Sequence, residues 1–97
     1  MALPNFFTGS KTGITTSAAA LSSTELHSRR GIQIVADSGN ANRVFIGQSS
    51  SVTAGTAEAT DGYPLAAGES RVLPITDPNS IFVIGPAGTG KLFYVSV

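Results

Sequence analysis

One stretch of the chain matches the start of a motif that binds nucleotide phosphates. Gly85-Pro-Ala-Gly-Thr-Gly-Lys91 fits Gly-x-x-x-x-Gly-Lys, in which backbone amides and the lysine hold phosphate oxygens. That chemistry also needs a Ser or Thr at the next position to bind Mg²⁺, and a helix that begins there. Position 92 is Leu, and the Leu-Phe-Tyr-Val that follows is typical of a strand. We therefore expect a glycine-rich hairpin loop over residues 85–91 and no cofactor.

No other group of residues has the composition of a catalytic or metal site. His27 is the only histidine and the chain has no cysteine, so the usual His and Cys ligands of a zinc site are missing. Serines are plentiful, but the Gly-x-Ser-x-Gly pattern around a nucleophilic serine does not occur. The acids are scattered in or near expected turns, where carboxylates such as those of Asp37 and Asp77 cap backbone amides. We expect no catalytic residue and no metal, and therefore no enzyme.

The charge of the chain is low and balanced. Six Lys and Arg residues offset six Asp and Glu residues, and charged residues make up only 12% of the sequence. A neutral chain has no electrostatic attraction to nucleic acid or to an anionic membrane. No apolar run approaches the ~20 residues of a membrane span. We expect no nucleic acid, membrane or small-molecule substrate as a partner, and the Ser, Thr, Ala and Gly of the surface suit close packing between proteins.

The elements expected after residue 30 are short strands. Runs of β-branched and aromatic residues alternate with turn signals at roughly ten-residue spacing. Pro74 cannot donate a ladder hydrogen bond, so its strand belongs at a sheet edge or ends there. The pattern predicts an all-β domain over residues 30–97, a small antiparallel sandwich or barrel of five to seven short strands. We expect strands at 32–35, 43–46, 71–75, 81–84 and 92–97, a weak edge strand within 52–59, a hairpin turn at 37–42, and further turns at 63–69 and 77–80.

The last two expected strands are apolar on both faces. Phe82 in the first strand, and Phe93 and Val95 in the second, lie where a sheet with one solvated face carries polar residues. The second face therefore needs a cover. It is either another part of the same chain, namely the opposite sheet or the N-terminal segment, or a neighbouring subunit.

Residues 1–29 are expected to form an extended arm ahead of the domain. A short helix over residues 17–30, with Glu25 in a weak capping box, is the alternative. Leu3, Phe6 and Phe7 are apolar anchors near the tip, and they need a partner in this domain or in a neighbouring subunit.

Arg29 and Arg30 form the only basic cluster and mark the start of the domain. They either meet acidic groups of a partner protein or remain solvated. Two arginines are too few for a nucleic-acid patch.

The order of short motifs after residue 42 is distinctive. They are Val44-Phe-Ile-Gly47, Gly62-Tyr-Pro-Leu-Ala-Ala-Gly-Glu-Ser70, Val72-Leu-Pro-Ile75, Asp77 to Ser80, Ile81-Phe-Val-Ile84 and Tyr94-Val-Ser-Val97. This order resembles that of small β-domain proteins in tailed-bacteriophage virions, which include head decoration (cement) proteins and head- or tail-associated fibre modules. The resemblance covers residues 30–97.

The resemblance implies a non-enzymatic protein of the virion surface, made in the host cytoplasm, that stabilises the phage head. It would bind the major capsid protein and form a homo-oligomer, for which a trimer is one candidate. The alternative is a receptor- or glycan-binding module of a head or tail fibre, acting through the loop that begins near Gln48 and the loop of residues 85–91. The interface expected for the decoration protein contains Leu3, Phe6, Phe7, Arg29, Arg30, Phe82, Phe93 and Val95.

Overall fold

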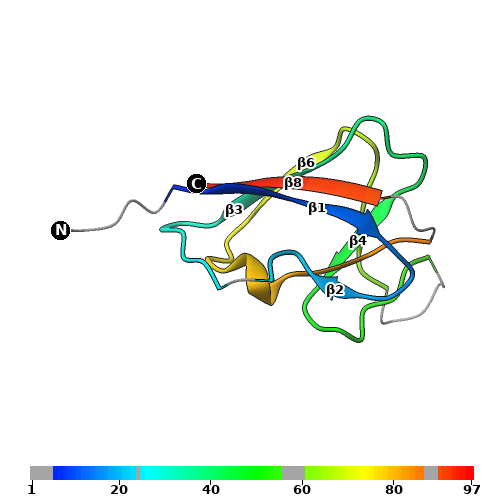
Figure 1. The fold of residues 1–97 in the computed structure, drawn as a ribbon, viewed down its shortest axis with the longest axis horizontal. Helices are drawn as coiled ribbons and strands as arrows, with labels where there is room; N and C mark the ends of the chain where they lie inside the picture. Colours follow the sequence, from blue (N-terminus) through cyan, green and yellow to red (C-terminus); the bar gives the residue numbers. More distant parts are fainter. Residues whose placement is uncertain (1–5, 24, 56–60, 87–89) are drawn as a thin grey trace.

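The computed structural model describes residues 6–23, 25–55, 61–86 and 90–97, which form two antiparallel sheets of four strands each (Figure 1). Sheet A contains, in spatial order, β1 (Thr8–Ile14), β8 (Gly90–Ser96), β3 (Ile32–Ala36) and β6 (Ser70–Leu73). Sheet B contains β2 (Ala19–Ala20), β7 (Phe82–Ile84), β4 (Val44–Gly47) and β5 (Tyr63–Leu65). A single 3₁₀ turn, η1 (Pro78–Ser80), precedes β7. The prediction of an all-β fold is confirmed.

Both sheets contribute side chains to one hydrophobic core. In β3, Ile32 and Ile34 are fully buried, whereas Gln33 between them is exposed, as expected for side chains that alternate across a strand. Val44 and Ile46 of β4 show the same alternation in sheet B. Burial of each such aliphatic side chain stabilises the fold by about 1.5–3 kcal/mol. The core cluster also contains Ile14, Leu21, Ala36, Leu65, Ile81, Val83, Leu92 and Tyr94.

The five strands predicted after residue 30 are all present, but their connections differ from the prediction. β3 and β4 lie in different sheets, and so do β7 and β8. The hairpins predicted at residues 37–42 and 85–91 are therefore wrong. The turn chemistry of the first is as expected, because Asp37 Oδ2 accepts a hydrogen bond from the Gly39 amide at 3.1 Å. A turn reverses the chain without fixing its partner, and both strands bury their apolar faces by packing in opposite sheets.

The segment predicted to be an arm contributes two strands. β1 pairs with β8, β2 pairs with β7, and Ile14 and Leu21 of this segment belong to the core. The described residues therefore contain eight strands rather than the five to seven predicted. Residues 17–23 and 25–30 contain no helix, so the alternative of a short helix is not seen in the described part of that segment. Residues 1–5, with Leu3, lie outside the described residues.

Edge strand β6 of sheet A is linked to edge strand β5 of sheet B by Arg71 and Tyr63. Arg71 Nε donates a hydrogen bond to Tyr63 Oη at 2.8 Å, and this bond raises the pKa of the guanidinium above its usual value. β6 ends before Pro74 at the edge of sheet A, as predicted. Residues 63–65, predicted as part of a turn, form strand β5 instead, and Pro64 is tolerated there because β5 is also an edge strand. The predicted weak strand within 52–59 is described only up to residue 55, where Thr53 forms an isolated bridge with Asp61.

Candidate interaction surface

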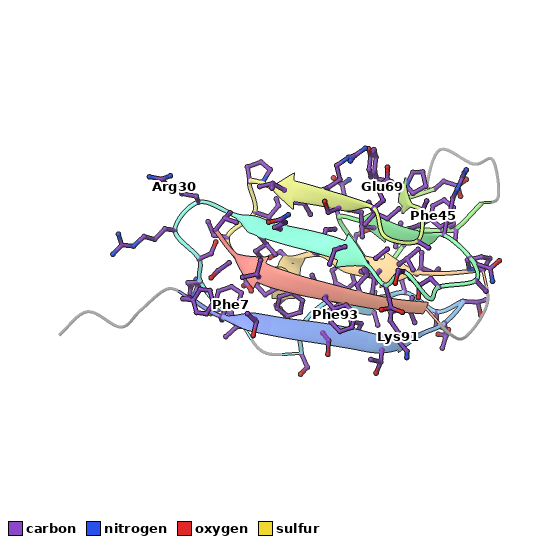
Figure 2. The ribbon with its side chains drawn as sticks, turned by 90° about the horizontal axis from the view of Figure 1, so that it is seen from above. Phe7, Arg30, Phe45, Glu69, Lys91 and Phe93 are labelled. Carbon is purple, nitrogen blue, oxygen red and sulfur yellow. The ribbon has the colours of Figure 1, made fainter. Side chains whose placement is uncertain are left out.

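The outward face of sheet A carries a row of apolar side chains along β8. Leu92 and Tyr94 point into the core, so Phe93 and Val95 point outward, and Val97 continues the row beyond the strand. Phe93 is 41% exposed and Val97 is 42% exposed. Figure 2 looks onto this face, with Phe93 labelled between β1 and β8. Strand β8, which is apolar on both sides, therefore has one side exposed to solvent in the described structure.

The strand register shows which side chains surround this row. Phe93 lies between Ser10 of β1 and Val35 of β3, and Val95 lies between Thr8 and Gln33. Because the β1 side chains are small, they leave a shallow hollow of about 620 Å³ over β1, β8 and β3. Its lining residues are all uncharged: Thr8, Gly9, Ser10, Gln33, Val35, Phe93, Tyr94 and Val95. Farther along the same face, Val72 of β6 is 58% exposed opposite Gln33.

The outward face of sheet B is covered in part by the chain itself. Val52, in the connection between β4 and β5, is only 7% exposed and packs against Gly47. A Cβ at Gly47 or Gly62 would overlap the Val52 side chain, so both positions need glycine for this cover to lie close to the sheet. In the neighbouring strand β7, Phe82 beside Gly47 is half-buried and Ile84 is 6% exposed. β7 is thus covered from within the chain, whereas β8 is not.

A second, smaller hollow lies where the row of β8 reaches the end of sheet A. It has a volume of about 240 Å³ and is lined by Phe6, Arg29, Ser96 and Val97. Two backbone hydrogen bonds hold its parts together: the Arg30 amide donates to the Val97 carbonyl at 3.3 Å, and the Val97 amide donates to the Gly31 carbonyl at 3.0 Å. Figure 2 shows Arg30 extending from this end of the sheet, opposite the end that carries Lys91.

The structure brings most of the predicted interface residues to this side of the molecule. Phe93 and Val95 lie on the outward face of sheet A, and Phe6 and Arg29, 23 positions apart in the sequence, line the same terminal hollow with Arg30 beside it. We call the combined area the β8 surface, and it consists of Phe6, Arg29, Arg30, Val35, Val72, Phe93, Val95 and Val97.

Two predicted interface residues have other positions. Phe7 is half-buried against the core, where its ring meets that of Tyr94 edge to face at 6.3 Å, and its amide donates to Ser96 Oγ at 2.9 Å. Phe82 lies in sheet B. Val35 and Val72 were missed, since only the pairing of β3 and β6 beside β8 places them on this face.

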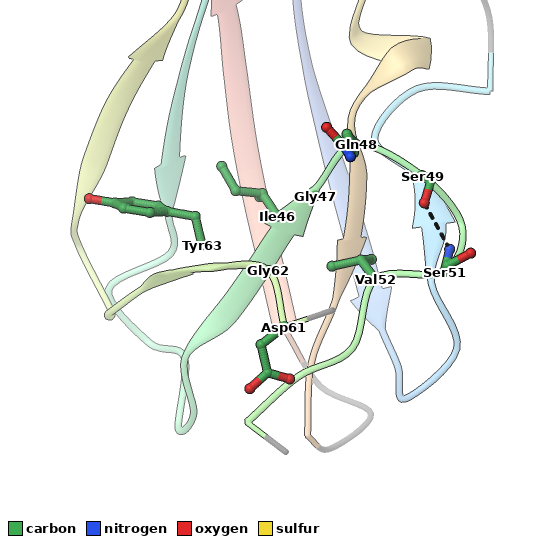
Figure 3. Close-up of a pocket in the computed structure, with 9 residues that line it drawn as sticks. All are labelled: Ile46, Gly47, Gln48, Ser49, Ser51, Val52, Asp61, Gly62 and Tyr63. Carbon is green, nitrogen blue, oxygen red and sulfur yellow. Dashed lines mark hydrogen bonds between the residues drawn. The ribbon is translucent and has the colours of Figure 1, made fainter. Parts of the chain in front are cut away.

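A polar hollow lies on the other side of the molecule, beside β4 (Figure 3). Its volume is about 320 Å³, and Gln48, Ser49, Asp61 and Tyr63 are among its lining residues. The polar groups also hold the loop in place, because Ser49 Oγ accepts from the Ser51 amide at 3.2 Å and Asp61 Oδ1 accepts from Thr53 Oγ1 at 2.7 Å. This is the first of the two loops that a ligand-binding module would use.

The residues considered for chemistry are dispersed. His27 is exposed, with Nε2 at 3.4 Å from Glu25 Oε1. Gly90 and Lys91, at the end of the phosphate-loop motif, begin strand β8 rather than the helix that phosphate binding requires. Among the described residues, no three His, Cys, Asp or Glu side chains gather where they could hold a metal ion. The described chain also contains no helix that is long and apolar enough to cross a membrane.

No protein-family model, curated protein or solved structure matches this chain.

Proposed function

We propose that this chain is a structural virion protein, a decoration (cement) protein that binds the major capsid protein and further copies of itself, and so stabilises a phage head. The observation that carries the proposal is the open apolar row of β8, with Phe93 and Val97 each more than 40% exposed. The corresponding face of sheet B is covered in part by the chain's own loop through Val52. An apolar patch bordered by polar residues is typical of a surface that binds another protein.

In this proposal the two sheets are the layers of a sandwich. The outward face of sheet A is four strands wide, which at the usual strand spacing gives roughly 400 Å². A stable complex buries about 800 Å² on each partner. The face alone would therefore bind weakly, and the hollow lined by Phe6 and Arg29 would have to add contact area.

Weak single contacts suit a protein that decorates a preformed lattice. When several subunits are joined, each further contact becomes intramolecular, and the overall affinity rises without any new kind of contact. We therefore propose a homo-oligomer, with a trimer as one candidate, in which one heterologous contact is repeated around an axis. The neutral, charge-poor chain favours such lateral packing because neighbouring subunits repel each other little.

Binding to heads tests this function directly. The chain is added to heads assembled from the major capsid protein encoded in the same genome, and bound protein is measured after sedimentation. Wild type should bind to saturation, and the double variant Phe93→Ser/Val95→Ser should lose most of the binding. Ile75→Ser is the matched control, because Ile75 is 40% exposed but lies beside Tyr63 and Ile81, away from the β8 surface. Absence of wild-type binding, or equal binding of all three proteins, would refute the proposal.

The second candidate is a receptor- or glycan-binding module, and the polar hollow beside β4 favours it. Amide, hydroxyl and carboxylate groups of Gln48, Ser49 and Asp61 stand there near Tyr63, which is 48% exposed. Such a combination can hydrogen-bond sugar hydroxyls while an aromatic ring contacts the apolar face of the sugar. A glycan array separates the two functions. A decoration protein gives no signal, whereas a binding module gives a signal that Gln48→Ala and Tyr63→Ala reduce.

A further inference from the structure

Two exposed arginines at the end of sheet A form no ion pair with an acidic side chain of the described residues. Arg29 and Arg30 are both exposed. The ion pairs of the described residues are His27 with Glu25 and Arg71 with Glu69, and neither Arg29 nor Arg30 takes part in one. An exposed guanidinium without an ion-pair partner can bind a carboxylate through charge-assisted hydrogen bonds.

The backbone that carries these arginines is held in place. The two hydrogen bonds between residues 30–31 and Val97 attach it to the end of β8. Gly31 has φ of 156°, and a Cβ there would overlap the carbonyl oxygen of Leu73, so the chain passes close to β6 at this point. The Ser28 amide also donates to the Thr76 carbonyl at 2.8 Å. A partner would meet a preorganised backbone, which lowers the entropy lost on binding.

The charges stand beside an apolar hollow. Phe6, which is 71% exposed, and Val97 line it together with Arg29. A ligand that satisfies this site needs a carboxylate for the guanidinium groups and an apolar side chain for the hollow. Arginine is well suited to the first task because its planar fork binds a carboxylate through two parallel hydrogen bonds.

A second copy of the described chain is a less suitable source of the required carboxylate. Each described acidic side chain already has a contact within its own chain: Glu25, Asp37, Asp61, Glu69 and Asp77. A carboxylate of a second copy would therefore have to be shared between Arg29 and the group that it already contacts. Nucleic acid is a poor fit as well, since its affinity depends on neutralising several phosphates and this chain has no net charge.

We propose that the hollow formed by Phe6, Arg29 and Val97 binds an acidic segment of a different protein, in which a carboxylate stands next to an apolar side chain. The inference rests on the proposed function in one respect, namely that the partner is a protein surface on which this chain docks. Arg29 and Arg30 bind the carboxylate, and Phe6 and Val97 contact the apolar neighbour.

A nuclear magnetic resonance titration of the full chain tests the proposed site. The probe is a blocked hexapeptide of alternating Leu and Glu, with the Gln analogue as the uncharged control. We expect saturable shifts of the amides of Phe6, Arg29, Arg30 and Val97, and a roughly fivefold to tenfold weaker interaction for Arg29→Gln/Arg30→Gln. Raising the salt to about 0.3 M should weaken binding similarly. Arg43→Gln, which removes an exposed arginine before β4, should bind like wild type.

Several results would overturn the inference. Equal binding of the Gln peptide would show that the acid is not needed, and an unchanged affinity of Arg29→Gln/Arg30→Gln would show that the arginines are not used. Shifts at the same amides on concentrating the protein without peptide would identify a second copy as the occupant. Tighter binding of oligothymidylate at this site would identify nucleic acid.

Binding to heads and binding of the Glu peptide distinguish a failure of the acidic site from a failure of the proposed function. If heads bind wild type and Arg29→Gln/Arg30→Gln equally, the decoration function is supported and the acidic site is refuted. If heads do not bind the chain but the Glu peptide does, the decoration function is refuted and the acidic site is supported.

Discussion

The ring of Tyr94 in β8 lies over Gly9 of the neighbouring strand β1, in the space that a Cβ at position 9 would occupy. Tyr94 is 9% exposed and belongs to the core, and the ring of Phe7 packs against its edge. The Tyr94 ring therefore holds β1 in addition to the backbone pairing with β8, and it needs a residue without a side chain beside it.

Gly9→Ala should destabilise the protein by about 1–3 kcal/mol, because the added methyl group displaces the Tyr94 ring from a packed site. Urea unfolding followed by circular dichroism measures the change. Ser10→Ala, one residue further along β1 with its side chain exposed, is the control and should change the free energy of unfolding by less than about 0.5 kcal/mol. Equal stability of the two variants would show that the ring does not lie over position 9.

β1 also shows where the sequence stops being informative about the fold. Residues 8–13 contain no large apolar side chain, so the run of β-branched and aromatic residues that identified β3, β4 and β8 is missing there. Its place in the sheet depends on Gly9 fitting under a tyrosine 85 positions later in the chain. The assignment of the strands to two sheets could likewise not be predicted from the sequence. Turn residues at 37–42 indicate that the chain reverses its direction, but they do not indicate which strand the next strand pairs with.

The candidate surface was predictable in part for the same reason. Phe93 and Val95 follow from a strand that is apolar on both sides. Val35 and Val72 join them only through the register of β3 and β6. The meeting of Phe6 with Arg29 depends on the end of β8 binding the turn at residues 30–31, a long-range contact without a local sequence signal.

The alternation along β8 predicts a large loss of stability for substitution of one residue and a small loss for its neighbour. Leu92 is fully buried, so Leu92→Ala should cost about 2–5 kcal/mol of stability. Phe93 points outward, so Phe93→Ala should cost less than about 1 kcal/mol. Thermal and urea unfolding of both variants measure the difference. The reverse order would place the strand one residue out of register, which moves every side chain to the other face.

Replacing either of two buried serines by alanine should change the free energy of unfolding, with opposite signs at the two positions. Ser28 Oγ is buried without a hydrogen-bond partner in the described structure, so Ser28→Ala should raise the free energy of unfolding by about 1 kcal/mol. Ser96 Oγ accepts the Phe7 amide at 2.9 Å, so Ser96→Ala should lower it by about 1 kcal/mol. Differential scanning calorimetry of the pair provides the comparison, and a loss of stability for Ser28→Ala would mean that its hydroxyl has a partner.

Asp77 ties the segment before β3 to η1. Its Oδ1 accepts from the Asn79 amide at 2.9 Å and from the Leu26 amide at 3.1 Å. Asp77→Ala should cost about 1–2 kcal/mol, whereas Asp77→Asn keeps an acceptor oxygen and should cost less. Urea unfolding of both variants tests this, and faster hydrogen exchange of the Leu26 amide in Asp77→Ala is the local signature. Unchanged exchange there would mean that Asp77 does not hold this segment.

We propose that the outward face of sheet A is buried when the protein docks on a head. The chain has no cysteine, so a single cysteine introduced at Val95 or at Ile75 reports on one site only. The measurement is the rate of maleimide labelling of each variant, free and in the presence of assembled heads. We predict that heads slow the labelling of Val95→Cys at least roughly tenfold, as expected for a thiol removed from solvent, and leave that of Ile75→Cys unchanged. Equal labelling rates of Val95→Cys with and without heads, under conditions in which the protein sediments with them, would contradict the claim.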